Sequence, residues 1–108
     1  MAKKENHLGE LEEKVMLAIV HLGEGAYGVP VRAALEEAGR SVSVGALYVT
    51  LQRLEEKGLV SGRDADPTPE RGGRAKRYFR VTGAGREALQ ATEAARRWLR
   101  GLVLGGAA

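Results

Sequence analysis

Cysteine is absent from this 108-residue sequence, and histidine occurs only twice. Without cysteine the chain can form neither disulfides nor thiolate metal sites. The two histidines, His7 and His21, are 14 positions apart, which gives little support to a zinc site or to a histidine general base. We therefore expect no metal and no cofactor, and a location in a reducing compartment, the cytoplasm.

Long apolar runs are also missing. The longest, Val15–Val20, has six residues, whereas a transmembrane helix needs roughly 20, and it is too short for the apolar region of a signal peptide. No association with a membrane is therefore expected. Hydrophobic residues make up 44% of the chain and charged residues 29%, which is typical of a folded globular protein. At this length we expect one domain with one modest core.

Positive charge is concentrated in the second half of the chain. Residues 1–60 hold seven Lys/Arg and nine Asp/Glu, a net charge of −2, whereas residues 61–108 hold ten and five, a net charge of +5. Five basic residues and no acidic residue lie within 71–80. Clustered positive charge fits a polyanion such as nucleic acid, although a solvated loop rich in lysine and arginine has the same composition.

Two amphipathic helices are predicted in the first 39 residues. Apolar residues recur at spacings of three and four from Leu8 and predict a helix that ends at Gly23. A second helix is expected to begin near Pro30, because proline suits a first helical turn, and to end just before Gly39. Its expected inner face is Val31, Ala34, Leu35 and Ala38.

A third helix is predicted between Ser43, a good N-cap residue, and Gly58, a good C-terminal cap. Its expected core stripe is Val44, Leu47, Leu51 and Leu54. Residues 59–60 then open a short strand, and residues 76–81 alternate like a half-buried strand, with Phe79 and Val81 on one side. The tract DADPTPERGG between them holds two prolines and two glycines and predicts a loop, so the two strands form a hairpin.

Thr82 is expected to cap a last helix, whose apolar residues follow a heptad pattern. These residues are Ala84, Ala88, Ala91, Ala95, Trp98 and Leu102. The predicted fold is therefore mainly α with a small β-hairpin: a winged helix-turn-helix, in the order helix, helix, helix, hairpin, helix, with a C-terminal dimerisation helix. We divide the chain into a disordered tail at 1–7, a winged-helix domain at 8–81, the dimerisation helix at 82–104 and a disordered tail at 105–108.

The face of the third helix opposite its core stripe has an unusual composition. It carries Gly45, Ala46, Val49, Gln52 and Arg53, with Tyr48 and Thr50 beside them. Small residues allow a helix backbone to sit deep in the major groove, where alanine or valine can touch thymine methyl groups. Glutamine and arginine can bond to base edges, and the two hydroxyls can reach phosphates. The alternative is that Tyr48 and Val49 pack against a neighbouring element.

Two patterns that suggest enzyme chemistry have simpler explanations. Residues 23–28 spell G-x-G-x-x-G, but a dinucleotide site needs this motif between a strand and a helix. Here it follows a helical segment, so an inter-helix turn is the better interpretation. The pairs Glu12–Glu13, Glu36–Glu37 and Glu55–Glu56 are adjacent in helices, point about 100° apart and are expected to be solvated. We therefore expect no enzyme activity.

Two longer segments carry a resemblance to a known family. They are GALYVTLQRLEEKGL at Gly45–Leu59 and GGRAKRYFRVT at Gly72–Thr82, within a similarity that spans residues 8–90. The sequence resembles the PadR family of bacterial transcriptional regulators, in particular its compact branch with one short C-terminal helix. The resemblance implies a winged helix that binds DNA through the third helix and the wing, and that dimerises through the C-terminal helix.

These observations together predict a homodimeric repressor that binds a palindromic operator in double-stranded DNA. The expected DNA contacts are Ser43, Gly45, Ala46, Tyr48, Val49, Gln52, Arg53, Arg71, Arg74, Lys76 and Arg77. The expected dimer contacts are Leu8, Leu11, Ala88, Ala91, Ala95, Trp98 and Leu102. The resemblance also implies a site for a small aromatic effector near the dimer interface.

The alternative function is a winged helix that docks other proteins through its exposed Gly-Ala-Val face. The basic cluster at 71–80 favours DNA, because protein docking does not need it.

Overall fold

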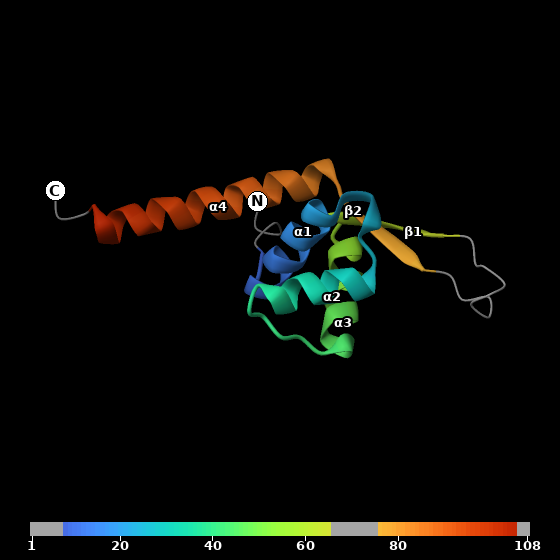
Figure 1. Ribbon diagram of the computed structural model, residues 1–108. Coiled ribbons are helices and arrows are strands. Elements are labelled where there is room, and N and C mark those ends of the chain that lie inside the picture. Colours follow the sequence, from blue (N-terminus) through green and yellow to red (C-terminus); the bar gives the residue numbers. More distant parts are fainter. Residues whose placement is uncertain (1–7, 66–75, 106–108) are drawn as a thin grey trace.

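The computed structural model describes residues 8–65 and 76–105 (Figure 1). The tail expected at 1–7, all but Gly105 of the tail expected at 105–108, and most of the loop expected between the strands lie outside the described residues. The elements are α1 (Glu10–Leu22), the 3-10 turn η2 (Gly23–Gly25), α2 (Gly28–Glu37), α3 (Val44–Glu56), β1 (Val60–Asp64), β2 (Arg77–Val81) and α4 (Gly83–Leu104). This order confirms the predicted helix, helix, helix, hairpin, helix arrangement.

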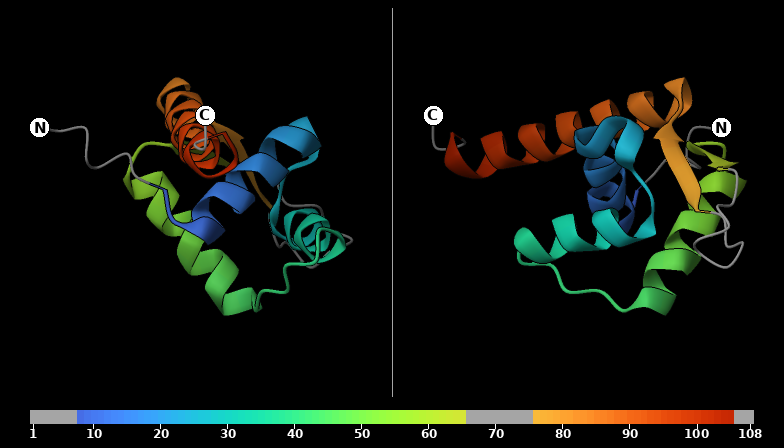
Figure 2. Two further views of the ribbon diagram at one scale, coloured as in Figure 1. Left: turned by 90° about the vertical axis from the view of Figure 1, so that its left-hand side faces the viewer. Right: turned by 45° about the vertical axis from the view of Figure 1, so that its right-hand side comes forward.

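Helix α1 lies at the centre of the molecule, with α2 and α3 on one side and α4 on the other (Figures 1 and 2). It packs against α2, α3, β2 and the start of α4. The apolar stripe predicted for α1 supplies much of the core, as expected for a helix surrounded by others. The largest fully buried side chains are Val15, Met16, Ile19, Val31, Leu47, Leu51, Leu54 and Leu59.

The core stripe of α3 differs from the prediction at two positions. Val44 is 51% exposed, and Thr50 is buried. Val44 is exposed because it borders an open cleft between the first turn of α3 and α2. Thr50 can be buried because its hydroxyl donates a hydrogen bond of 2.8 Å to the carbonyl of Ala46, one turn earlier. The prediction that Thr50 contacts phosphates is therefore wrong. Ala38, expected on the inner face of α2, is exposed at the end of that helix.

The hairpin is antiparallel, with Val60 opposite Val81 and Gly62 opposite Phe79. Phe79 and Val81 are buried, as the alternating pattern predicts. The amide of Phe79 also donates a hydrogen bond of 2.8 Å to the carbonyl of Ala26, in the segment between η2 and α2. The hairpin is therefore fastened to the start of α2 as well as to α3.

The two ends of α4 differ in their surroundings. Thr82 caps the helix by accepting a hydrogen bond of 3.0 Å from the amide of Gly85, and Gly85 and Ala88 pack into the body of the molecule. The prediction that Ala88 lies in a dimer interface is wrong, because the core of its own chain buries it. Arg96, about two turns further on, still pairs with Glu13 of α1, and beyond it α4 projects away from the other helices (Figure 1).

This projection sets the overall dimensions, 63 × 32 × 22 Å. The radius of gyration is 16.1 Å, whereas a compact chain of this length has about 13 Å. Among the described helices, none is long and apolar enough to cross a membrane.

Candidate DNA-binding surface and dimerisation arm

The first turns of α3 present the surface that the sequence predicts. Ser43 caps the helix, because its hydroxyl accepts a hydrogen bond of 3.1 Å from the amide of Ala46. The residues of this helix that are predicted to contact DNA are all exposed: Gly45, Ala46, Tyr48, Val49, Gln52 and Arg53. Val49 is 51% exposed, so its side chain is not covered by a neighbouring element as the alternative interpretation requires.

Tyr48 lies across the start of α2, directly over Gly28. A methyl group added to Gly28 would collide with the phenol, since it would lie 2.8 Å from the ring carbon Cζ. Glycine at this position therefore leaves room for the hydroxyl end of the Tyr48 ring against α2, while the side chain stays 48% exposed. The contact positions Tyr48 at the edge of the surface formed by α3.

We expect Gly28→Ala to displace Tyr48 and to weaken DNA binding by about tenfold, the loss of one good contact. The cost in folding stability should be under about 1 kcal/mol, because the colliding group is the free end of an exposed side chain. Gly25→Ala is the matched control, since a methyl group there meets nothing within 4 Å. Thermal unfolding and gel shifts measure the two effects. A Gly28→Ala protein that binds DNA normally would show that Tyr48 does not take part.

Gln52 and Arg53 extend the same surface towards the C-terminal half of α3. The amide of Gln52 lies 3.5 Å from a carboxylate oxygen of Glu56, one turn further on. Within the described part of the chain, Arg53 forms no ion pair. Both side chains are therefore available to hydrogen-bond to a partner that approaches this face.

The wing residues differ in their surroundings. Arg71 and Arg74 lie outside the described residues. Arg77 pairs with Glu55 of α3 at 2.7 Å and with Asp64 of β1 at 2.8 Å. The hydrogen bond to Glu55, followed by that to Asp64, raises the pKa of Arg77 above its ordinary value. Because both carboxylates belong to the same chain, Arg77 anchors the hairpin to α3, and we remove it from the proposed DNA contacts.

Two tyrosines hold the hairpin against the start of α2, a contact that the sequence pattern did not indicate. The rings of Tyr27 and Tyr78 are 5.3 Å apart and tilted. The ammonium group of Lys76 lies 4.5 Å from the centre of the Tyr27 ring, and the guanidinium of Arg63 lies 5.3 Å from that of Tyr78. Such cation–π contacts restrain long side chains. Lys76, a predicted DNA contact, is thus half-buried and held in place.

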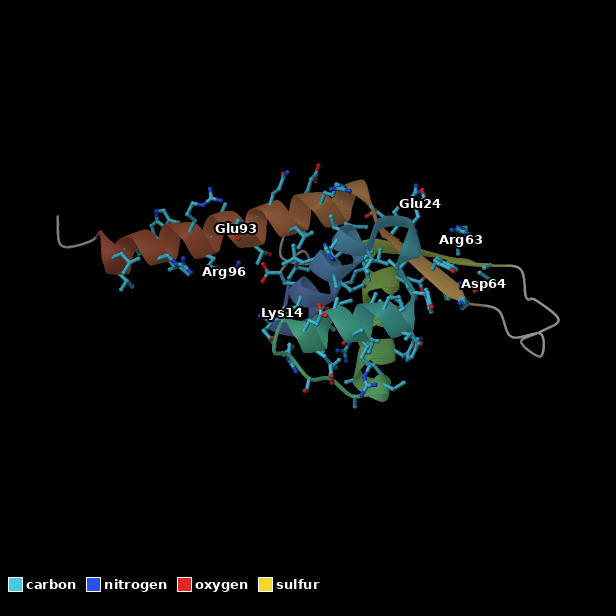
Figure 3. The ribbon with its side chains drawn as sticks, in the orientation of Figure 1. Lys14, Glu24, Arg63, Asp64, Glu93 and Arg96 are labelled. Atoms are coloured by element: carbon cyan, nitrogen blue, oxygen red, sulfur yellow. The ribbon has the colours of Figure 1, made fainter. Side chains whose placement is uncertain are left out.

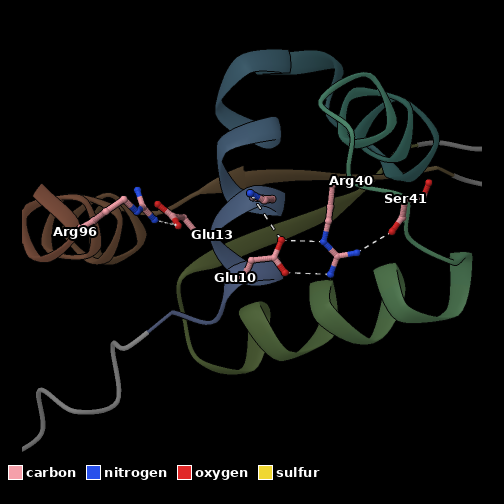
Figure 4. A network of polar contacts seen from close by, with 6 residues as sticks. Glu10, Glu13, Arg40, Ser41 and Arg96 are labelled. Atoms are coloured by element: carbon pink, nitrogen blue, oxygen red, sulfur yellow. Dashed lines mark hydrogen bonds and ion pairs between the residues drawn. The ribbon is translucent and has the colours of Figure 1, made fainter. Parts of the chain in front are cut away.

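Three carboxylates at the start of α1 each bind a different part of the fold. Glu10 bonds to Arg40, beyond the end of α2, at 2.8 Å, and Glu13 bonds to Arg96 of α4 (Figure 4). These bonds raise the pKa of both arginines. Glu13 is 8% exposed, so the prediction that the Glu12–Glu13 pair is solvated is wrong.

Glu12 bonds to Lys57, just after α3, at 2.8 Å. Burial acts to raise the pKa of Glu12, but hydrogen bonds from Lys57 and from the Gly9 amide outweigh burial and lower the pKa. Such ion pairs add little to stability when exposed, but they fix orientation. Here they orient α1 relative to α3, which carries the proposed DNA-reading face.

The second half of α4, residues 91–104, forms an arm with a large apolar face. The exposed apolar side chains of this arm are Ala91, Ala94, Ala95, Trp98, Leu99, Leu102, Val103 and Leu104, of which Ala91, Ala95, Trp98, Leu99 and Leu102 lie on one face. Trp98 alone is 65% exposed. Leu8 and Leu11, also predicted at a dimer interface, are half-buried against the core. An apolar face of this size on one element of a small protein marks an interaction surface.

Comparison with known proteins agrees with this architecture. Residues 16–91 match the model of the transcriptional regulator PadR-like family. The chain belongs to this family. The PadR-like chain is 38% identical over 94 residues to the transcriptional regulator Rv3488 of Mycobacterium tuberculosis, covering 85% of this chain and 84% of that protein.

Solved PadR-like structures share the fold. A PadR-like transcription factor from Bacteroides fragilis superposes with a TM-score of 0.75 at 30% identity, covering 94% of this chain and 92% of that one. A PadR family transcriptional regulator from Eggerthella lenta superposes with a TM-score of 0.69 at 30% identity, covering 87% of this chain and 82% of that one. These similarities confirm the predicted winged helix-turn-helix. The family match ends at residue 91, so Trp98 and Leu102 of this PadR-like chain lie beyond it.

Proposed function

We propose that this PadR-like regulator is a homodimeric repressor that binds a palindromic operator in double-stranded DNA, with one α3 in the major groove of each half-site. The observation that carries the proposal is the exposed face of α3, on which small residues at the first turn are followed by Gln52 and Arg53. Membership of a family of transcriptional regulators supports it.

The side chains of α3 suit the major groove in size and chemistry. The groove is about 12 Å wide and admits one α-helix. Gly45 and Ala46 allow close approach of the backbone, and Val49 can contact a thymine methyl group. The side-chain amide of Gln52 has the geometry to pair with adenine, and the guanidinium of Arg53 has the geometry to pair with guanine. Ser43 and Tyr48 lie at the edge of this surface, where hydroxyls can bond to phosphates.

The wing supplies contacts that do not depend on base sequence. Arg71, Arg74 and Lys76 provide positive charge for phosphates beside the half-site. Arg77 keeps the hairpin at a set position relative to α3 through Glu55. The wing and α3 can therefore engage the duplex as one unit.

Dimerisation places two α3 helices on one face of the duplex. Half-sites that are one helical turn apart require recognition helices about 34 Å apart. The apolar face of the arm is suited to join two copies of the chain, with Trp98 in the seam. The flat indole ring also offers a surface on which a small aromatic effector can stack.

Gln52→Ala tests whether α3 reads bases. We expect this change to weaken binding to the upstream DNA of the protein's own gene by about 1–3 kcal/mol, and binding to random duplex by much less, because a base contact is lost. Gln90→Ala is the matched control, since it removes the only other glutamine, which is exposed on α4. Gel shifts on both DNAs measure the difference. Equal losses on the two DNAs would contradict base reading, and a wild-type protein that binds neither DNA would favour the protein-docking alternative.

A further inference from the structure

The outer face of the hairpin forms a hollow of about 570 Å³ with the end of α1, with η2 and with the first turns of α4. Three arginines line it, one each from β1, β2 and α4: Arg63, Arg80 and Arg86. Ser61 lies in the same hollow, directly opposite Arg80 in the strand register. The proposed DNA-binding surface uses none of these four residues.

The three guanidinium groups are available to a ligand. All three side chains are exposed, and within residues 8–65 and 76–105 none of them forms an ion pair. Arg63 is opposite Tyr78 in the register, so Arg63 and Arg80 are diagonal neighbours. The Cα atoms of such neighbours lie about 7 Å apart. The contact of Arg63 with the Tyr78 ring holds its side chain on the outer face. Two of the three arginines therefore extend from neighbouring positions on the same face of the hairpin.

We propose that this hollow binds a phosphorylated small molecule. Arginine pairs with phosphate oxygens through two parallel hydrogen bonds, and the Ser61 hydroxyl can donate a further one. A single carboxylate occupies one guanidinium, whereas a phosphate or diphosphate group has enough oxygens for three. The volume lies within the range of small-molecule sites. Among the described residues that line the hollow, Glu24 is the one acidic residue, and it can accept a hydrogen bond from a hydroxyl or amino group elsewhere on the ligand.

The position of the hollow favours a small molecule over the DNA backbone. The inner face of the hairpin is turned towards α3, because a methyl group on Gly62 would meet Glu55 of α3 and would lie 2.8 Å from the Arg77 guanidinium. Arg63 and Arg80 extend from the opposite face. Figure 3 shows Arg63 and Glu24 on the side of the hairpin that is turned away from α3. A duplex bound to α3 therefore does not reach all three arginines.

A ligand in this hollow touches the wing and α4 together. Arg80 belongs to the strand that leads back from the wing, and Arg86 belongs to the part of α4 that packs into the body. Bridging them with one phosphate group restrains the wing relative to the base of α4.

Titration calorimetry with inorganic pyrophosphate tests the proposal. We expect Arg80→Ala and Arg86→Ala each to weaken pyrophosphate binding by about tenfold or more, because each loses a charge-assisted pair. Arg100→Ala, which removes an exposed arginine of α4 outside the hollow, should leave the affinity unchanged. Glu24→Gln should tighten binding, because it removes the negative charge from the rim.

Three outcomes would overturn the proposal. The first is no binding of pyrophosphate to the wild-type protein, and the second is an equal loss in Arg80→Ala and Arg100→Ala. The third comes from a titration in the presence of excess random duplex at low salt. Displacement of pyrophosphate from the Arg80-dependent site by the duplex would assign the hollow to the DNA backbone, whereas retained binding supports a separate site. Because the titrations of the wild-type protein and its variants contain no operator DNA, a failed operator experiment does not affect their result.

Discussion

Trp98→Glu should convert the protein from a dimer to a monomer, and its affinity for the operator should fall by at least about a hundredfold. In the proposed dimer this substitution places a charge in the seam between the two arms, where exclusion of water would make it cost several kcal/mol. Once the two copies separate, each binds its half-site alone and loses the advantage of a second site held nearby, which is typically worth a factor of a hundred or more. Light scattering coupled to size exclusion measures the assembly, and gel shifts measure the affinity.

Arg100→Glu is the matched control for this experiment. Arg100 is exposed on the same arm, but it lies about 200° around the helix from Trp98. This variant introduces the same negative residue away from the apolar face, so it should remain dimeric. A Trp98→Glu protein that stays dimeric and binds the operator normally would show that the arm is not the interface.

Operator affinity should also fall on the order of a thousandfold between 50 and 200 mM salt. If the dimer neutralises about six phosphates, the counterions that it releases give this steep dependence. The contributing cations are Arg71, Arg74 and Lys76 of each copy, since Arg77 is already paired with Glu55 and Asp64. Fluorescence anisotropy with a labelled operator duplex across this salt range measures the slope.

Arg74→Ala should reduce that slope by about two, one for each copy, and should weaken operator and random duplex to a similar extent. Arg100→Ala removes a positive charge from the arm and should leave the slope unchanged. An affinity that is flat between 50 and 200 mM salt would contradict the role of the wing.

The sequence predicted the elements of the fold and most of their ends. Caps carry much of this information, because their chemistry is local: Ser43 and Thr82 each accept a hydrogen bond from an amide three residues later. Gly58 follows α3 with a φ of 76°, which favours glycine. The observed starts of α1 and α2, at Glu10 and Gly28, each differ by two residues from the expected Leu8 and Pro30.

Burial along α3 was harder to predict, because helical spacing alone allows two similar stripes. Val44 and Thr50 lie on either flank of the three buried leucines, and hydrophobicity alone predicts that the valine is the buried one. In the structure Thr50 is buried instead, because a backbone carbonyl accepts a hydrogen bond from its hydroxyl, and Val44 is exposed beside an open cleft. Both are properties of the folded chain.

The ion pairs and aromatic contacts that position the candidate surface could not be predicted from local patterns. Glu13 and Arg96 are 83 residues apart in the sequence, and nothing near Glu13 indicates a partner on α4. The basic cluster at 71–80 predicts a role in DNA binding for the whole wing. Charge counting alone could not show that Arg77, one member of this cluster, binds two carboxylates of its own chain.

The length of α4 makes the spacing of the two DNA-reading helices sensitive to small rotations. Its 22 residues span about 33 Å, and the helix is held near its base by the packing of Gly85 and Ala88 and further along by the pair between Glu13 and Arg96. A tilt of about 6° at the base moves the far end by about 3.4 Å, the rise of one base pair. In the proposed dimer α4 therefore acts as a lever, and the ion pair between Glu13 and Arg96 is one of the contacts that fix its angle to the rest of the chain.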